Sequence, residues 1–163
     1  MFEVGDTVVY PQHGAGRVER KERKLVLGEE REYLSIRIIH SDMTLMVPSD
    51  GAEEAGLRKV MDDEMLERVV QVLEGASSEE SETFSRRFRH NREKIKTGDV
   101  LELAEVIRNL TWRDRTKTLS TGERQMLSQA KRVLVSELAY ARGTDEVAAV
   151  EWLDALLDQA QVG

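Results

Sequence analysis

The sequence predicts a two-domain α+β protein, in which a small β-barrel is followed by an all-α domain of about five helices. Both prolines of the 163-residue chain, Pro11 and Pro48, lie in its first third, and proline is poorly tolerated inside helices. The spacing of apolar residues then changes from a strand-like to a helical period. The stretch 48–60, which holds a proline and two glycines, separates the two patterns. We therefore expect a β-rich domain at residues 1–52 and a helical domain at residues 53–163.

Short β-branched and aromatic runs predict the first strands. Thr7–Tyr10 is such a run, and His13–Gly16 after it is typical of a tight hairpin in which glycine adopts a positive φ. Arg17–Arg20 begins the next strand, and Gly28–Glu30 forms the following turn. Several short strands with tight turns in about 50 residues indicate a small curled sheet or barrel.

Alternation of apolar and polar residues assigns the faces of two later strands. In the first, the residues expected to face the core are Leu34, Ile36 and Ile38, and those expected to face outward are Tyr33, Ser35 and Arg37. In the second, Leu45 and Val47 face inward, which leaves Met46 outside. An outward Met46 near Arg37 and the basic residues of the stretch 20–24 suits a partner surface, and equally a lone exposed methionine.

Helix start and stop signals divide the second domain into five helices. The first begins near Asp62 and stops at Gly75, and the second runs from about Glu79 to Lys96 and ends at Gly98. The remaining signals are Asp99 as the cap of the third helix, the capping box Ser120–Glu123 before the fourth, Gly143 as its stop, and Thr144 or Asp145 as the start of the fifth.

Composition excludes several function classes. The chain has no cysteine, and its three histidines show no metal-ligand spacing, so we expect no catalytic residues, no metal and no cofactor. It has no apolar run that could span a membrane and no signal segment at its start, so we expect a cytoplasmic protein. The net charge of −7 argues against general nucleic-acid binding, because phosphate neutralisation supplies most non-specific affinity.

One segment reverses that charge locally. Phe84–Lys96 holds six Lys/Arg against one acidic residue, and the acidic cluster Glu79, Glu80 and Glu82 precedes it. Such a concentration is typical either of a nucleic-acid footprint or of a solvated helix face. Phe84 and Phe88 share a helix face, where they are either core residues or an exposed wedge of the kind that inserts at base steps in a minor groove.

The opening stretch Phe2–Val18, FEVGDTVVYPQHGAGRV, resembles the CarD/CdnL family of bacterial transcription regulators. Further matches extend over nearly the whole chain: Glu32–Leu34, Val47–Pro48, Gly56–Arg58, Ser85–Arg87, Gly98–Val100, Ala104–Val106, Leu119–Ser120 and Gly122–Glu123. The opening motif is also similar to the polymerase-binding module of transcription-repair coupling factors. The helical half, with its Ser-Arg-Arg segment, separates the two.

The resemblance implies a Tudor-like barrel that binds the β-subunit lobe of RNA polymerase, and a helical domain at the upstream edge of the transcription bubble. Family members stabilise the open promoter complex there, with an aromatic residue, usually tryptophan, wedged into the minor groove near the −10 element. Here the matching residue is Phe84. The family's DNA-facing basic positions fall on Arg86, Arg89 and Arg124, and their neighbours Arg87 and Arg113 join the expected DNA-binding set.

The expected polymerase-binding residues are Lys24, Arg37 and Met46. Lys24 and Met46 stand where the family has arginines, so the contact at Met46 is expected to be more apolar than in relatives. The alternative function is a protein–protein adaptor that docks on RNA polymerase without touching DNA. We expect a monomer, with an element-swapped dimer as the alternative.

Overall fold

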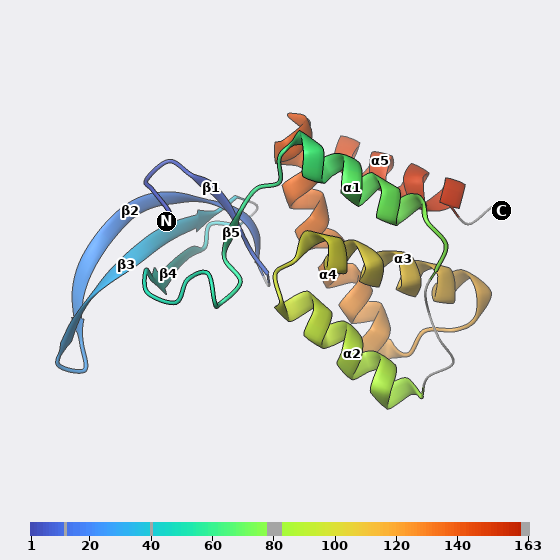
Figure 1. Cartoon of the computed structure of the whole chain (residues 1–163), viewed down its shortest axis with the longest axis horizontal. Helices are drawn as coiled ribbons and strands as arrows, with labels where there is room; N and C mark the ends of the chain where they lie inside the picture. Colours follow the sequence, from blue (N-terminus) through green and yellow to red (C-terminus); the bar gives the residue numbers. More distant parts are fainter. Residues whose placement is uncertain (12, 40, 78–82, 161–163) are drawn as a thin grey trace.

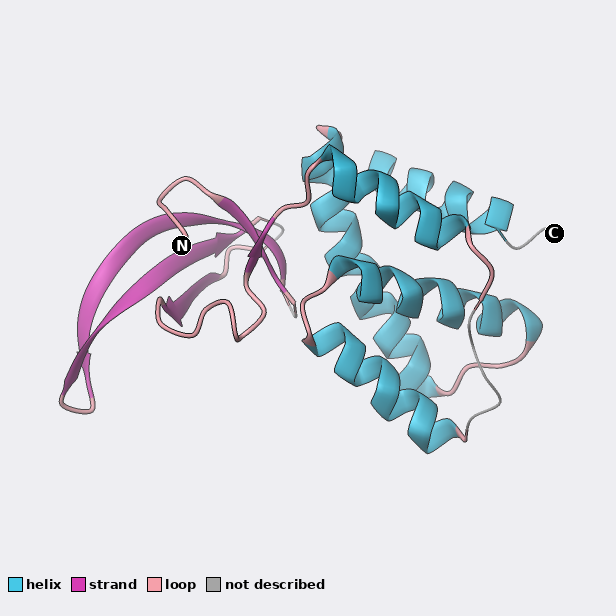
Figure 2. Ribbon diagram, in the orientation of Figure 1, coloured by secondary structure: helices cyan, strands magenta, loops and turns pink. Residues whose placement is uncertain are grey.

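The structure of the protein is a computed structural model, and it describes residues 1–11, 13–39, 41–77 and 83–160. Within these ranges, an antiparallel sheet of five strands precedes five helices, which confirms the predicted fold class (Figures 1 and 2). The strands are β1 Thr7–Tyr10, β2 Gly14–Val26, β3 Glu29–Ile38, β4 Thr44–Pro48 and β5 Arg58–Lys59, in the spatial order β4-β3-β2-β1-β5. His40 and the acidic cluster Glu79, Glu80 and Glu82 lie outside the described residues.

The period-2 alternation places side chains as expected. Leu34, Ile36 and Ile38 are buried in the core of the β-domain, and Val47 joins them from β4. Ser35 differs from the expectation, because it lies on the outward face of β3 and is nevertheless fully buried. Its cross-strand neighbours on that face are Arg20 and Met46.

The sheet continues beyond residue 52, where we expected the β-domain to end. Val8 and Val9 of β1 pair with Lys59 and Arg58 of β5. Because β2 occupies only one side of β1, the other side remains open to hydrogen bonding and takes up this short strand. The connection between the domains therefore starts after Lys59.

The helices follow their predicted signals. They are α1 Asp63–Glu74, α2 Phe84–Lys96, α3 Val100–Thr116, α4 Thr121–Arg142 and α5 Glu146–Ala160. Asp62, Asp99 and Ser120 cap three of them, Ser120 through a complete capping box with Glu123, and Gly143 ends α4 in a left-handed conformation. Asp145, rather than Thr144, caps α5, since its carboxylate accepts a hydrogen bond from the Ala148 amide. The first residue of α2 is Phe84, later than the expected Glu79, and the Thr83 hydroxyl accepts from the Arg86 amide at 3.4 Å.

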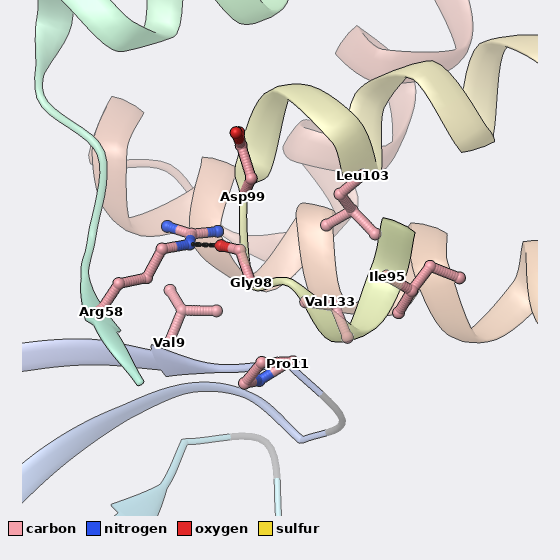
Figure 3. A pocket seen from close by; sticks show the side chains of 8 residues that line it. All are labelled: Val9, Pro11, Arg58, Ile95, Gly98, Asp99, Leu103 and Val133. Atoms are coloured by element: carbon pink, nitrogen blue, oxygen red, sulfur yellow. Dashed lines mark hydrogen bonds between the residues drawn. The ribbon is translucent and has the colours of Figure 1, made fainter. Parts of the chain in front are cut away.

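The two domains are packed directly against each other. Val9 of β1 joins the helical core, and the amide of Ala15 donates to the hydroxyl of Ser136 on α4 at 3.0 Å. Arg58 of β5 donates from Nε to the carbonyl oxygen of Gly98, between α2 and α3 (Figure 3). The small cavity that Figure 3 draws beside Arg58 is part of this junction and has no room for a ligand.

Candidate nucleic-acid and protein interfaces

The two phenylalanines of α2 have different environments. The Phe84 side chain is 46% exposed, whereas Phe88 is half-buried, and their ring centroids lie 5.6 Å apart. Phe88 packs against Gly122 of α4 so closely that a Cβ at Gly122 would lie 3.2 Å from the Phe88 ring. Phe88 is therefore the packing residue, and Phe84 is the aromatic that remains available to a partner.

Arg87 faces the interior, unlike Arg86, Arg89 and Arg124. It is 8% exposed, and its Nε and Nη2 donate to the two carboxylate oxygens of Glu123 at 2.8 and 3.3 Å. The helical period explains this placement, since Arg87 shares the buried side of α2 with Phe88 and Asn91. Arg87 thus differs from the exposed position expected of it, since its guanidinium binds Glu123, and its contact with DNA stays a prediction.

Glu123 is itself almost completely buried. Burial alone would raise the pKa of its carboxyl, but hydrogen bonds from Arg87 and Ser120 and the positive charge of Arg87 outweigh burial and lower the pKa. The ionised pair ties the first turn of α4 to the first turn of α2. Phe84 also lies against this pair, with the Arg87 guanidinium carbon 5.8 Å from its ring centroid.

The remaining expected DNA-binding residues lie on three helices, α2, α3 and α4. Arg86 and Arg89 are exposed on α2, and Arg124 is exposed on the first turn of α4. Arg124 lies 3.9 Å from the carboxylate of Asp114 on α3, and the adjacent Arg113 is partly buried. Arg86 directly precedes Arg87, and Arg124 directly follows Glu123. Because Arg87 and Glu123 are paired, Arg86 and Arg124 lie at the same end of the helical domain.

Sequence reasoning missed the second role of Glu123 and the contact of Gly122. The sequence pattern assigns Glu123 only to the capping box and gives Gly122 no role. No local signal marks either contact, because their partners on α2 lie 34 to 36 residues earlier in the chain. Lys117, an exposed cation whose Nζ lies 5.8 Å from the Trp112 ring centroid, also stands at this end of α3 and was not in the expected set.

The β-domain carries the other expected contact surface. The strand register sets Arg37 between Arg17 and Thr44. The next row of the same face sets Ser35 between Met46 and Arg20, and a row further out sets Lys24 opposite Arg31. Lys24, Arg37 and Met46 therefore share the outer face of the sheet, which we call the outer β-face. Met46 is 38% exposed, as its outward position predicts, and Arg37 lies 3.9 Å from both Glu19 and Asp42.

Other kinds of site receive no support in the described ranges. Those residues contain no group of His, Asp and Glu side chains suited to a metal ion. His13 contacts the Tyr10 ring at a centroid distance of 5.5 Å, on a different domain from His90. Among the described helices, none combines the length and the apolar character needed to cross a membrane.

The described part of the chain thus presents two distinct surfaces, an outer β-face that carries Lys24, Arg37 and Met46 and a basic helix, α2, that exposes the Phe84 ring. Residues 2–61 match the family model described as the CarD-like/TRCF RID domain, and residues 68–154 match the model described as CarD, C-terminal domain. The chain therefore belongs to the CarD-like family of transcription regulators, whose N-terminal module is an RNA polymerase-interacting domain. This confirms the resemblance seen in the opening motif. The family is not an enzyme class.

Two relatives illustrate the match. YdeB, a candidate transcription factor of Bacillus subtilis (strain 168), is 37% identical over 146 residues, which cover 90% of this chain and 95% of YdeB. The 72-residue N-terminal domain of Myxococcus xanthus CarD, solved by solution NMR, is 34% identical, with a TM-score of 0.32. That match covers 36% of this chain and 79% of the solved one.

Proposed function

We propose that this protein binds the β-subunit lobe of RNA polymerase through its outer β-face and stabilises the open promoter complex through the start of α2. The observation that carries the proposal is the exposed Phe84 ring. This ring contacts the half-buried Phe88 ring, and exposed arginines lie next to it in α2. An apolar ring held in this way can insert at a base step of the minor groove near the −10 element, where it would oppose re-pairing of the duplex. Such a role requires a cytoplasmic protein and one copy per polymerase.

The net charge of −7 is compatible with this function if the polymerase contact comes first. Once the β-domain is docked, the DNA contact becomes intramolecular and gains from effective concentration. Arg86, Arg89 and Arg124 then need to supply only a few phosphate contacts, which fix position rather than sequence. We expect little binding to free duplex at physiological salt, and promoter protection only when polymerase is present.

The polymerase contact is assigned to Lys24, Arg37 and Met46. A flexible thioether at Met46 can fill an irregular apolar surface, while the two cations flank it on the same face. Met46→Ala should therefore weaken binding to the isolated β lobe. Unchanged binding would show that Met46 is a lone exposed methionine.

The decisive experiment measures the lifetime of the open complex with wild-type protein, Phe84→Ala and Arg86→Ala. Val147→Ala, an exposed apolar side chain on α5, is the matched control. We expect both α2 variants to shorten the lifetime while the control preserves it. If both variants retain the full lifetime and still bind polymerase, the protein acts as an adaptor without DNA contact.

A further inference from the structure

The end of the β2–β3 hairpin exposes three consecutive apolar residues. Leu25 is 74% exposed, Leu27 is 100% exposed, and Val26 between them is also exposed. Figure 1 shows that this turn lies at the end of the molecule farthest from the helices. We call residues 25–27 the hairpin tip. Single exposed apolar residues are ordinary, but a contiguous exposed group is typical of an interaction site.

The backbone of the tip is also unfavourable for its sequence. Leu27 and Gly28 both have positive φ, 53° and 82°, as in the two-residue hairpin turns that favour Asn-Gly. Leu27 is the one non-glycine residue with positive φ in the described part of the chain. A leucine there is strained and wholly exposed to water, so it stabilises the folded protein neither through its backbone nor through packing. These two observations together indicate a role outside the free molecule.

The tip is continuous with the outer β-face. Lys24, which belongs to that face, directly precedes Leu25. β4 pairs with β3 only from Tyr33 to Arg37, and β1 pairs with β2 only from Gly14 to Arg17. The outer part of the hairpin is therefore a two-stranded ribbon that projects past the rest of the sheet. A partner that covers the outer β-face meets this ribbon on the same side.

We infer that the hairpin tip inserts into an apolar pocket of RNA polymerase beside the surface that receives the outer β-face. This inference rests on the proposed function and extends its polymerase contact. The charges next to the tip favour a protein over an anionic membrane, because the cations Arg23, Lys24 and Arg31 are balanced by Glu29, Glu30 and Glu32. Burial of Leu27 in such a pocket removes its exposed apolar area from water in the complex.

The test compares Leu27→Asn with wild-type protein in thermal unfolding and in binding to RNA polymerase. Asparagine favours the left-handed conformation and is polar, so we expect a higher melting temperature together with about tenfold weaker binding. Opposite changes in stability and affinity cannot arise from misfolding. Leu25→Ser should also weaken binding, whereas Val147→Asn, a 68% exposed control on α5, should not.

Two outcomes overturn the inference while sparing the proposed function. In the first, Leu27→Asn and Leu25→Ser bind polymerase as wild type does while Met46→Ala binds more weakly. In the second, wild-type protein self-associates with rising concentration and Leu27→Asn abolishes this without changing polymerase affinity, which would assign the tip to a second copy of the chain. If wild-type protein does not bind polymerase at all, the proposed function itself fails.

Discussion

Arg58 of β5 forms a bidentate salt bridge with both carboxylate oxygens of Glu137 of α4. Nη1 and Nη2 of Arg58 donate to Oε2 and Oε1 of Glu137 at 2.5 and 2.6 Å, and the Met61 amide donates to the same carboxylate at 2.7 Å. Glu137 is fully buried. Such a bidentate pair fixes direction as well as distance, and it joins the β-domain to the helical domain beside the contacts of Val9 and Ala15.

Loss of one partner of this pair should loosen the junction. Arg58→Ala leaves the buried Glu137 carboxylate without its cation, and we expect it to lower the free energy of unfolding by about 3 kcal/mol. Chemical denaturation measures this, with Arg132→Ala, an exposed arginine of α4, as the control. X-ray scattering should show a wider range of interdomain angles. An unchanged scattering profile would mean that the remaining contacts alone hold the domains.

Arg58→Ala also distinguishes the polymerase contact of the proposed function from its DNA contact. Arg58 lies away from the outer β-face, so affinity for the polymerase lobe should stay at the wild-type value. The open complex should be shorter-lived, because a mobile helical domain presents Phe84 at a lower effective concentration. An equal loss of polymerase affinity would instead indicate damage to the β-domain.

Gly98 is expected to tolerate no side chain. Its φ is +78°, and a Cβ there would lie 2.8 Å from the carbonyl oxygen and 3.1 Å from the Cα of Gly56. Gly98→Ala should destabilise the protein by roughly 2–4 kcal/mol, because left-handed strain adds to a clash with backbone that cannot rotate away. Gly143→Ala is the matched control, since its φ is +65° but its Cβ would meet open space. Equal effects in thermal unfolding would show that the contact with Gly56 is unimportant.

The Arg87–Glu123 pair predicts a defined dependence of stability on pH. The pKa of Glu123 is lower in the folded protein than in the unfolded chain, so its contribution is present above the unfolded pKa of about 4.3 and is lost as pH falls through the folded pKa. Glu123→Gln should therefore lower the free energy of unfolding by about 3 kcal/mol at pH 7. Its difference from wild type should shrink as pH falls below about 4.3.

Denaturation curves of both proteins at neutral and acid pH test this, with Glu67→Gln, an exposed glutamate of α1, as the control. A difference between wild type and Glu123→Gln that is as large in acid as at pH 7 would contradict an ionised Glu123.

The size of the ring at position 84 should set the lifetime of the open complex. Under the proposed function, Phe84→Ala removes a half-exposed ring whose burial against DNA would be worth about 1.4 kcal/mol, so we expect a roughly tenfold shorter lifetime. Phe84→Trp adds apolar area and an N–H donor, and should lengthen the lifetime a few-fold. Promoter dissociation in the presence of competitor measures both. A lifetime that does not follow ring size would exclude insertion of this side chain.

Much of the architecture was determined by local sequence alone. The capping box at Ser120, the cap at Asp99 and the stop at Gly143 depend on groups within a few residues, and the structure confirms each of them. Alternation likewise predicted the buried apolar face of β3, and the alternation in β4 placed Met46 on the outside. These features were predictable because the period of a strand or helix, and the chemistry of its ends, are local properties.

Tertiary structure decided what no period could decide. Phe84 and Phe88 have the same side chain and lie four residues apart on one face of α2. Only the approach of α4 at Gly122 makes Phe88 a packing residue and leaves Phe84 exposed. Arg87 carries the same charge as Arg86 and Arg89, yet it is buried because it pairs with Glu123, 36 residues away in the chain. The sequence by itself therefore determined the family and the basic character of α2. Which side chains there are free to meet a partner depended on long-range packing, because burial is a property of neighbours that the chain brings together only on folding.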